Sequence, residues 1–282
     1  MYILVLIYIY MDKPMIPIMM CGLSRTFPFG WGKRSDELLS SYATFFDRLS
    51  EKYTLFFYIS TDDLHLKDTF TFLSKYGEIR NIHLSNTGYK YIKIKDTAPL
   101  QKYIDIYRSA TPSDIEWKAQ GERAIHQFHR NLDVCNLCIS DYDVYSNAKV
   151  LVRMRLDTVF GDELTSKIIK YIDEACISKQ ESSFFSSDLI YCGTKDLLSY
   201  VLKGLENGLG ILDWEKPYDS KAYSAMFCHI SPLKMPHGSN DYKRWIMSPE
   251  GQIIALLHKY LMKIGEENYN ATRCDNYPVI IR

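Results

Sequence analysis

The segment from Val150 to Asp157 is the feature that most limits how this chain can fold. Residues 150–154 are apolar or β-branched apart from Arg153, and Arg155 and Asp157 follow directly. A short apolar run flanked by polar residues is typical of an interior strand in a sheet that is covered on both faces. The segment therefore predicts an α/β protein in which two arginines and a carboxylate lie where a buried strand ends.

The rest of the chain alternates between strand and helix patterns. An apolar run at residues 15–21, a helix pattern that starts at Ser35 and an aromatic run at residues 53–60 form the βαβ unit of a parallel sheet. The later patterns predict strands at residues 79–84 and 183–192, and helices at residues 113–140, 163–175 and from Ser248 onward. We therefore expect a Rossmann-type, mostly parallel sheet flanked by helices.

Composition indicates a folded chain without a general affinity for polyanions. Of the 282 residues, 46% are hydrophobic and 24% are charged, which is enough apolar material for one large domain or two closely joined ones. The 34 basic and 34 acidic residues balance, so no overall attraction draws the chain to nucleic acid or to an anionic membrane. We expect no nucleic-acid partner.

The first residues are interpreted as an extension that precedes the folded domain. Residues 1–10 are apolar, but a bilayer span needs about 20 such residues, and charged residues soon interrupt this run. A secretory signal would need a basic start and a small-residue cleavage site, and the run has neither. We expect an N-terminal extension over residues 1–14, no membrane span and a cytoplasmic location. Met11 is an alternative start to Met1.

The cysteines favour free thiols. Seven cysteines are an odd number, and they are scattered along the chain, which is typical of a protein in a reducing compartment. Cys135 and Cys138 form a CxxC without a second pair or a His pair at zinc-finger spacing. Apolar residues recur at helical spacing around them, so buried helical thiols are favoured over zinc ligands.

Several predicted strands are followed by residues that could bind a nucleotide, with Thr61 and Asp62 as candidates for its ribose or base and the others for its phosphates or a metal ion on them. Ligands of an open α/β sheet bind outside the carboxyl ends of its strands. Guanidinium forks match phosphate oxygens, a carboxylate is a hard ligand for Mg²⁺ or Mn²⁺, and glycine lets the backbone approach a ligand closely. The candidate residues are Gly22, Arg25, Thr61, Asp62, Arg153, Arg155 and Asp157. Two alternatives stay open, because Arg155 and Asp157 can form an ion pair that closes the strand, and Thr61 and Asp62 can cap a helix.

Other candidates lie in the second half of the chain. Asp188 falls among apolar residues of the predicted strand at 183–192, where a carboxylate is either paired or functional because an isolated buried charge is costly. Residues 214–245, which include His237 and Asp241, are rich in aromatic and hydrogen-bonding groups of the kind that bind carbohydrate. Glu250 has a structural role in the first turn of a helix and is a minor candidate for a base.

Several common catalytic motifs are absent from the sequence. It contains no GxxxxGK[ST], GxGxxG, HExxH or GxSxG segment. These absences argue against a P-loop kinase, a dinucleotide-dependent dehydrogenase, a zincin protease and a serine hydrolase.

Five short segments together resemble a known group of enzymes. They are Cys21-Gly22-Leu23-Ser24-Arg25-Thr26-Phe27, Ser60-Thr61-Asp62, Val152-Arg153-Met154-Arg155-Leu156-Asp157, Asp188-Leu189-Ile190-Tyr191-Cys192-Gly193 and Ser248-Pro249-Glu250. In this order they resemble GT-A-type glycosyltransferases. The chain is similar to the WavE-like transferases of lipopolysaccharide synthesis and to glycosyltransferases of large DNA viruses of the chlorovirus and mimivirus type. The resemblance covers about residues 15–265.

The resemblance implies roles for the candidate residues. Asp157 corresponds to the metal-binding DXD motif and would hold Mn²⁺ or Mg²⁺ on the donor's diphosphate, while Arg155 stands where the first acid of that motif would be. Gly22, Arg25, Thr61, Asp62, Arg153 and Arg155 would bind the nucleotide sugar. Asp188 would be the catalytic base, with Glu250 and Asp241 as further candidates, and His237 is a candidate metal or phosphate ligand.

The resemblance also implies the organisation and the activity of the chain. Residues 15–282 would form one GT-A-like domain, with a donor-binding part at about 15–160 and an acceptor-binding part at about 161–265. The expected activity is transfer of a sugar from a UDP- or GDP-type donor to a hydroxyl of a glycan, and a viral context adds UDP-xylose to the donors considered and places the enzyme in the host cytoplasm. Two alternatives are a non-catalytic carbohydrate-binding or scaffold protein and a metal-dependent nucleotidyl or phosphoryl transferase.

Overall fold

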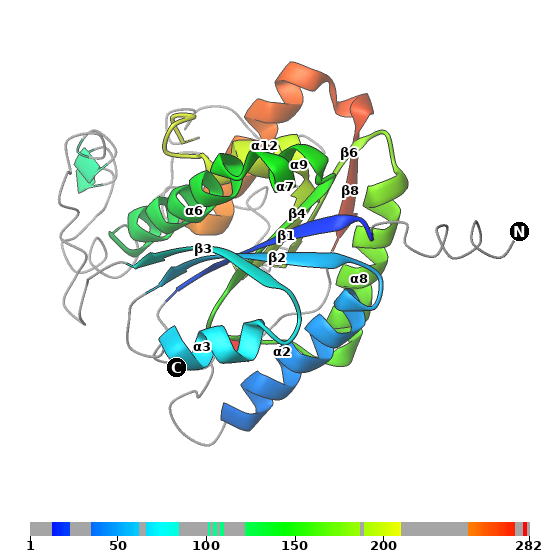
Figure 1. The fold of residues 1–282 in the computed structure, drawn as a ribbon. Coiled ribbons are helices and arrows are strands. Elements are labelled where there is room, and N and C mark those ends of the chain that lie inside the picture. The colour runs from blue at the N-terminus through cyan, green and yellow to red at the C-terminus, as the bar shows by residue number, and fades with distance from the viewer. Residues whose placement is uncertain are drawn as a thin grey trace, which may run out of the picture.

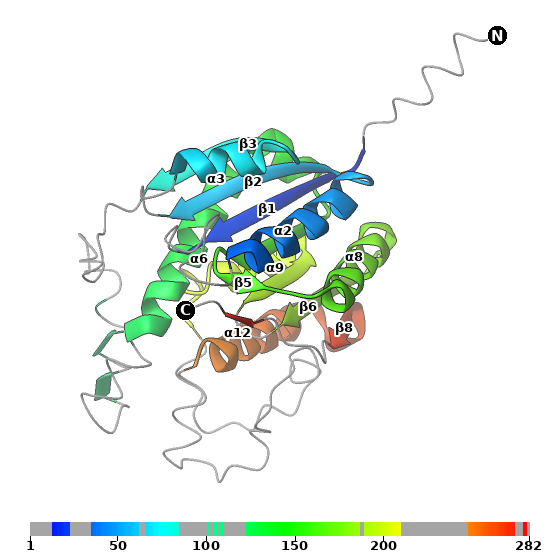
Figure 2. The same ribbon diagram turned by 90° about the horizontal axis from the view of Figure 1, so that it is seen from below.

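The computed structural model describes residues 13–22, 35–61, 66–84, 101, 104–105, 108–109, 122–186, 189–209, 248–273 and 279–280. The structure of these residues is a three-layer α/β arrangement, with helices on both faces of a central sheet (Figure 1). Viewed from below, the sheet lies behind the helices of one face (Figure 2). The predicted α/β class and the mostly parallel sheet are confirmed.

The central sheet has seven strands in the order β3-β2-β1-β4-β7-β6-β8. The strands are β1 (Met15–Cys21), β2 (Thr54–Thr61), β3 (Glu78–Leu84), β4 (Val150–Arg155), β6 (Glu181–Ser186), β7 (Ile190–Thr194) and β8 (Tyr269–Arg273). Pairing is parallel from β3 to β4 and between β6 and β8, whereas β7 is antiparallel to both β4 and β6. Among these seven strands, β7 therefore runs against the other six.

A short second sheet follows the central strand. It pairs β5 (Thr158–Val159) with β9 (Val279–Ile280) in antiparallel fashion. Because β5 begins one residue after Asp157, a C-terminal segment lies beside the residues that the sequence indicated as functional.

Each face of the sheet is covered by its own group of helices (Figure 1). One face carries α2 (Ser35–Ser50), α3 (Leu66–Leu73) and α8 (Asp162–Ile177), and the other carries α6 (Glu122–Ser140), α7 (Tyr142–Asn147), α9 (Lys195–Leu202) and α12 (Pro249–Ile264). The 3₁₀ turn η5 (Glu266–Asn268) joins α12 to β8. None of the helices in the described ranges combines the length and the apolar character that crossing a bilayer requires.

Local sequence explains why these helices form and which side they bury. In α2, Leu38, Tyr42, Phe45, Phe46 and Leu49 recur at helical spacing, and all five are fully buried against the sheet. Helix α12 starts as predicted, because the Ser248 side chain accepts a hydrogen bond from the Gly251 N–H at 3.1 Å and a proline occupies the first turn. Cys135 and Cys138 are buried in α6 as free thiols, which confirms that prediction.

One predicted strand is wrong. Residues 183–192 do not form a single strand, because β6 ends at Ser186 and β7 begins at Ile190, and the two strands pair antiparallel. Of the three residues between them, Ser187 and Asp188 lie outside the described part of the chain, and Leu189 is buried in a turn. The apolar residues of the two strands lie close together in sequence and resemble one run, because periodicity alone does not show where a strand ends.

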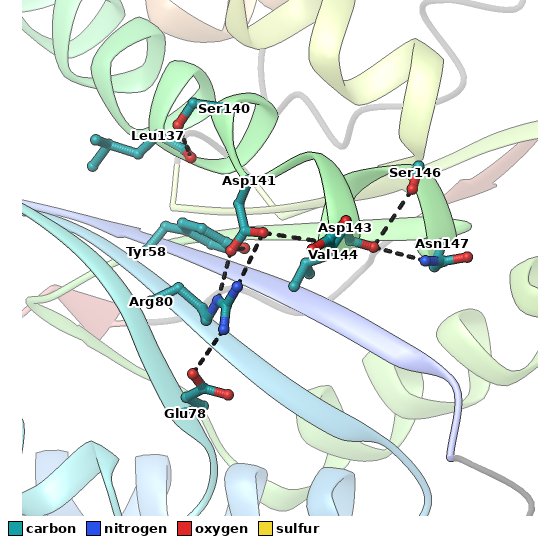
Figure 3. A network of polar contacts seen from close by, with 10 residues as sticks. All are labelled: Tyr58, Glu78, Arg80, Leu137, Ser140, Asp141, Asp143, Val144, Ser146 and Asn147. Atoms are coloured by element: carbon teal, nitrogen blue, oxygen red, sulfur yellow. Dashed lines mark hydrogen bonds and ion pairs between the residues drawn. The ribbon is translucent and has the colours of Figure 1, made fainter.

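A polar network ties the edge strand β3 to the junction of α6 and α7 (Figure 3). Asp141 accepts hydrogen bonds from the Tyr58 hydroxyl at 2.9 Å and from Arg80 Nε at 2.6 Å, and Arg80 also bonds Glu78 at 2.9 Å. Arg80 lies at an irregularity of β3, where Ile79 and Asn81 pair with consecutive residues of β2. This β-bulge directs an arginine toward Asp141 and anchors an edge strand to the helical layer.

Candidate functional site

The strand order places a topological switch point between β1 and β4. The chain leaves β1 toward β2 and β3 on one side, and it returns to β4 on the other side of β1. Helix α2, which follows β1, lies on one face, and α6, which precedes β4, lies on the other (Figures 1 and 2). In open α/β sheets the ligand crevice is found outside the carboxyl ends of the strands at such a point. The carboxyl ends of β1 and β4 are therefore the candidate site.

The two strand ends are joined in register. Cys21, the last residue of β1, pairs with Arg155, the last residue of β4, and Met19 pairs with Arg153. The Leu156 N–H donates to the Cys21 carbonyl at 3.3 Å, so the contact continues past the end of β4. Residues more than 130 positions apart in the sequence thus meet at one edge of the sheet.

Gly22 follows the last residue of β1 at this edge. Its φ angle of 147° is one that residues with a side chain rarely adopt, and a Cβ atom there would lie 3.4 Å from the Leu156 nitrogen. Its N–H donates to the Ser60 carbonyl on β2 at 3.1 Å. Glycine at this position therefore lets β1 end in close contact with both of its neighbouring strands.

Arg155 and Asp157 form a forked ion pair at the same edge. Arg155 Nε donates to one carboxylate oxygen of Asp157 at 2.8 Å, and Nη2 donates to the other at 2.7 Å. The side chains are 25% and 20% exposed, so the pair is half-buried. The ion pair that the sequence left as an alternative is present, and it lies at the switch point. Gly22, Arg153, Arg155 and Asp157, together with Cys21, are called the switch-point site below.

Arg153 is the buried cation of the switch-point site. Only 1% of it is exposed, and its guanidinium lies over the Tyr191 ring at 4.6 Å, a cation–π contact. Nη2 donates to the Cys21 sulfur at 3.2 Å, and the Cys21 thiol donates to the Asn131 side-chain oxygen of α6 at 3.5 Å. Arg153 Nη1 also donates to the Leu189 carbonyl at 3.5 Å, so Arg153 has contacts with β1, with β7 and with the residue before β7.

Three residues that support the site were not identified from the sequence. The Tyr42 hydroxyl of α2 donates to the Arg155 carbonyl, Asn131 of α6 contacts Cys21, and Tyr191 of β7 lies under Arg153. Tyr42 and Tyr191 fit their apolar patterns, so no local signal separates them from core residues. Asn131 carried a weak signal, because a fully buried amide on a helix facing a sheet requires a partner.

Burial keeps the Tyr42 hydroxyl protonated. The pKa of Tyr42 is raised far above its ordinary value of 10.0, mainly because the ring is buried and next because Asp157 is nearby. The hydroxyl consequently stays protonated at neutral pH and donates to the Arg155 carbonyl.

The remaining predicted site residues are distributed differently. Thr61 is buried at the carboxyl end of β2, one strand away from the switch point. Glu250 lies in the first turn of α12, where a carboxylate favours the helix N-terminus. Arg25, Asp62, Asp188, Asp241 and His237 lie outside the described residues, so their predicted roles stay predictions.

The described residues of the switch-point site do not fit a divalent cation. Both oxygens of Asp157 are engaged by Arg155, and the two guanidinium groups outnumber the one carboxylate. Within the described ranges, no three His, Cys, Asp or Glu side chains gather as a metal site would require. Mn²⁺ and Mg²⁺ prefer several oxygen ligands of negative or neutral charge. The arrangement of charges favours an anion instead.

Comparisons with protein-family models and with curated proteins found no match to this chain.

Proposed function

We propose that this protein is a glycosyltransferase with a GT-A-like fold, which moves a sugar from a UDP- or GDP-type donor to a hydroxyl of a glycan. The observation that carries the proposal is the register pairing of Cys21 with Arg155, which brings Gly22 and the Arg155–Asp157 pair to one switch point. A glycine turn beside guanidinium groups at this edge is suited to a diphosphate.

The proposed chemistry asks little of the protein beyond charge and position. A nucleoside diphosphate leaves the anomeric carbon as negative charge develops on its phosphate oxygens, and fixed cations stabilise that charge. Arg155 lies at the edge and Arg153 is buried beneath it, so both contribute positive potential there. The acceptor hydroxyl loses its proton to a carboxylate, for which Asp188, Glu250 and Asp241 are the proposed candidates.

A ligand screen followed by a transfer assay tests this proposal. Melting temperature is measured with UDP, GDP and their sugars, including UDP-xylose, each with Mn²⁺ and with EDTA, because a ligand that binds the folded state raises the melting temperature. Nucleotide release is then measured with glycan acceptors. We expect one nucleotide series to raise the melting temperature by several degrees and one sugar to be transferred.

Three other results would contradict the proposal in different ways. Glycan binding that is indifferent to nucleotide would favour the carbohydrate-binding or scaffold alternative. Transfer of a nucleotidyl or phosphoryl group with no sugar transferred would favour the metal-dependent nucleotidyl or phosphoryl transferase. If no nucleotide changes the melting temperature, the proposed binding of a nucleotide-sugar donor is contradicted.

A further inference from the structure

Both carboxylate oxygens of Asp157 are already paired with a cationic side chain, that of Arg155. These two oxygens accept two hydrogen bonds from one guanidinium, at 2.8 and 2.7 Å, in the forked geometry that Arg and carboxylate favour. A metal ion bound to this carboxylate would have to displace that fork. Because the pair is half-buried, separation would leave a partly desolvated guanidinium without its carboxylate, which is costly.

Two cationic side chains of β4 lie on the same face of the sheet. Residues of β4 alternate between the two faces, since Val152 and Met154 belong to the core under α2 and α8, whereas Leu151 belongs to the core under α6. Arg153 and Arg155 therefore both lie on the α6 face. Both guanidinium groups attract a diphosphate that approaches this strand end.

The backbone that carries Arg155 is fixed before any ligand arrives. The Arg155 N–H donates to the Leu189 carbonyl at 3.1 Å, and its carbonyl accepts from the Tyr42 hydroxyl. Asp157 then fixes the guanidinium plane through two contacts. A group held in this way binds an anion without first losing rotamer freedom, so its position is prepared for binding.

We infer, on the basis of the proposed function, that Arg155 is the group that binds the diphosphate and that Asp157 is its positioning residue. The guanidinium supplies the positive charge at this edge, and nucleotide binding needs no divalent cation. Asp157 accepts two of the five N–H groups of Arg155 and thereby sets the direction of the whole fork. The role differs from the metal-ligand role that the resemblance implies for Asp157.

The test measures the affinity of the full chain for UDP and for inorganic pyrophosphate by titration calorimetry. For the wild type we expect the dissociation constants in EDTA and in Mn²⁺ to agree within about twofold. Arg155→Lys should weaken both ligands about tenfold or more, because an ammonium keeps the charge but loses the planar fork. Binding that disappears in EDTA and returns with Mn²⁺ would overturn the inference, and this comparison requires no variant.

Two substitutions of Asp157 separate a positioning residue from a metal ligand. Asp157→Asn retains an oxygen that accepts from Arg155, so we expect affinity within about threefold of the wild type, whereas Asp157→Ala should weaken binding about tenfold. A metal ligand would be lost in both variants, because a neutral amide replaces a carboxylate poorly. Equal and complete loss in the two variants would therefore overturn the inference.

The Arg80–Asp141 pair provides a matched control. It has the same forked geometry, with contacts of 2.6 and 3.3 Å, but it ties β3 to the start of α7 and has no assigned role in the switch-point site. Arg80→Lys should lower the melting temperature and leave both dissociation constants within about twofold. An equal loss of affinity in Arg80→Lys and Arg155→Lys would show a general effect of stability and would overturn the inference.

The outcome for the inference is distinct from the outcome for the transferase. Pyrophosphate binding that depends on Arg155 and not on a metal, without any sugar transfer, would support the anion site and contradict the transferase activity. Sugar transfer that requires Mn²⁺ would support the transferase activity and contradict the metal-independent anion site. Absence of binding to both UDP and pyrophosphate would remove both.

Discussion

Arg80 and Asp141 are 61 positions apart in the sequence, and they meet in a forked ion pair with an Arg80 Nε to Asp141 Oδ2 distance of 2.6 Å (Figure 3). Asp141 also accepts from the Tyr58 hydroxyl and from the Val144 N–H at the start of α7. One carboxylate thus joins β2, β3 and the helical layer. It is the polar anchor of the sheet edge that lies farthest from β8.

The Asp141 network gives stability a pH dependence. The hydrogen bonds from Arg80, and then that from Tyr58, hold the pKa of Asp141 below its ordinary value of 3.8. The folded state therefore binds fewer protons at this residue than the unfolded state, so the contribution is present above about pH 4 and is lost as the pH falls below it. Asp141→Asn should cost about 1–3 kcal/mol at pH 7. In urea unfolding at pH 7 and pH 3, the difference from wild type should shrink at the lower pH, and a constant difference would contradict the assignment.

Gly77 is required by a close contact with β2. A Cβ atom at this position would lie 2.4 Å from the Leu55 carbonyl oxygen and 2.8 Å from the Leu55 Cβ. Since a backbone carbonyl in a paired strand cannot yield easily, Gly77→Ala should destabilise the fold by about 1–3 kcal/mol. Gly161→Ala is the matched control, because nothing lies within 4 Å of an added Cβ there. Chemical unfolding should separate the two variants, and equal stabilities would refute the contact.

Tyr42 should affect the switch-point site more than its contribution to stability suggests. Tyr42→Phe keeps the ring contacts with Phe46 and Phe160 but removes the donor to the Arg155 carbonyl. We expect a loss of about 1–2 kcal/mol in unfolding free energy and a several-fold weaker affinity for UDP. Tyr53→Phe is the control. Tyr53 directly precedes β2, at the end of the strand away from the switch-point site, and the substitution removes a 2.7 Å hydrogen bond to Asp173. The UDP affinity of Tyr53→Phe should equal that of the wild type. An equal loss of UDP affinity in both variants would contradict a role of Tyr42 in the switch-point site.

The CxxC thiols should be unreactive in the folded protein. Burial raises the pKa of Cys135 to about 12 and also raises the pKa of Cys138, so both thiols stay protonated at pH 8. Iodoacetamide at pH 8 should label both residues in denaturant and neither in the native state. Peptide mass spectrometry distinguishes them from the other cysteines. Rapid native labelling of Cys135 would contradict its burial, and specific zinc binding by the pair would contradict its structural role.

Much of the fold was predictable because it follows from local patterns. The apolar runs that became β1, β2 and β4 and the helical spacing in α2 depend only on residues close in sequence. The start of α12 was equally local, since a serine, a proline and a glutamate in succession satisfy the first turn of a helix. The βαβ unit followed because parallel strands joined by one helix lie side by side.

The sequence by itself determined the α/β class, most strand and helix positions and the end of β4 as a place rich in charge. Tertiary structure alone decided that β7 runs against its neighbours, that Cys21 pairs with Arg155 and that Tyr42, Asn131 and Tyr191 support the site. It also brought both carboxylate oxygens of Asp157 to the guanidinium of Arg155. The physical reason is that strand order and register depend on packing between distant segments, and backbone hydrogen bonds form equally well with almost any side chain.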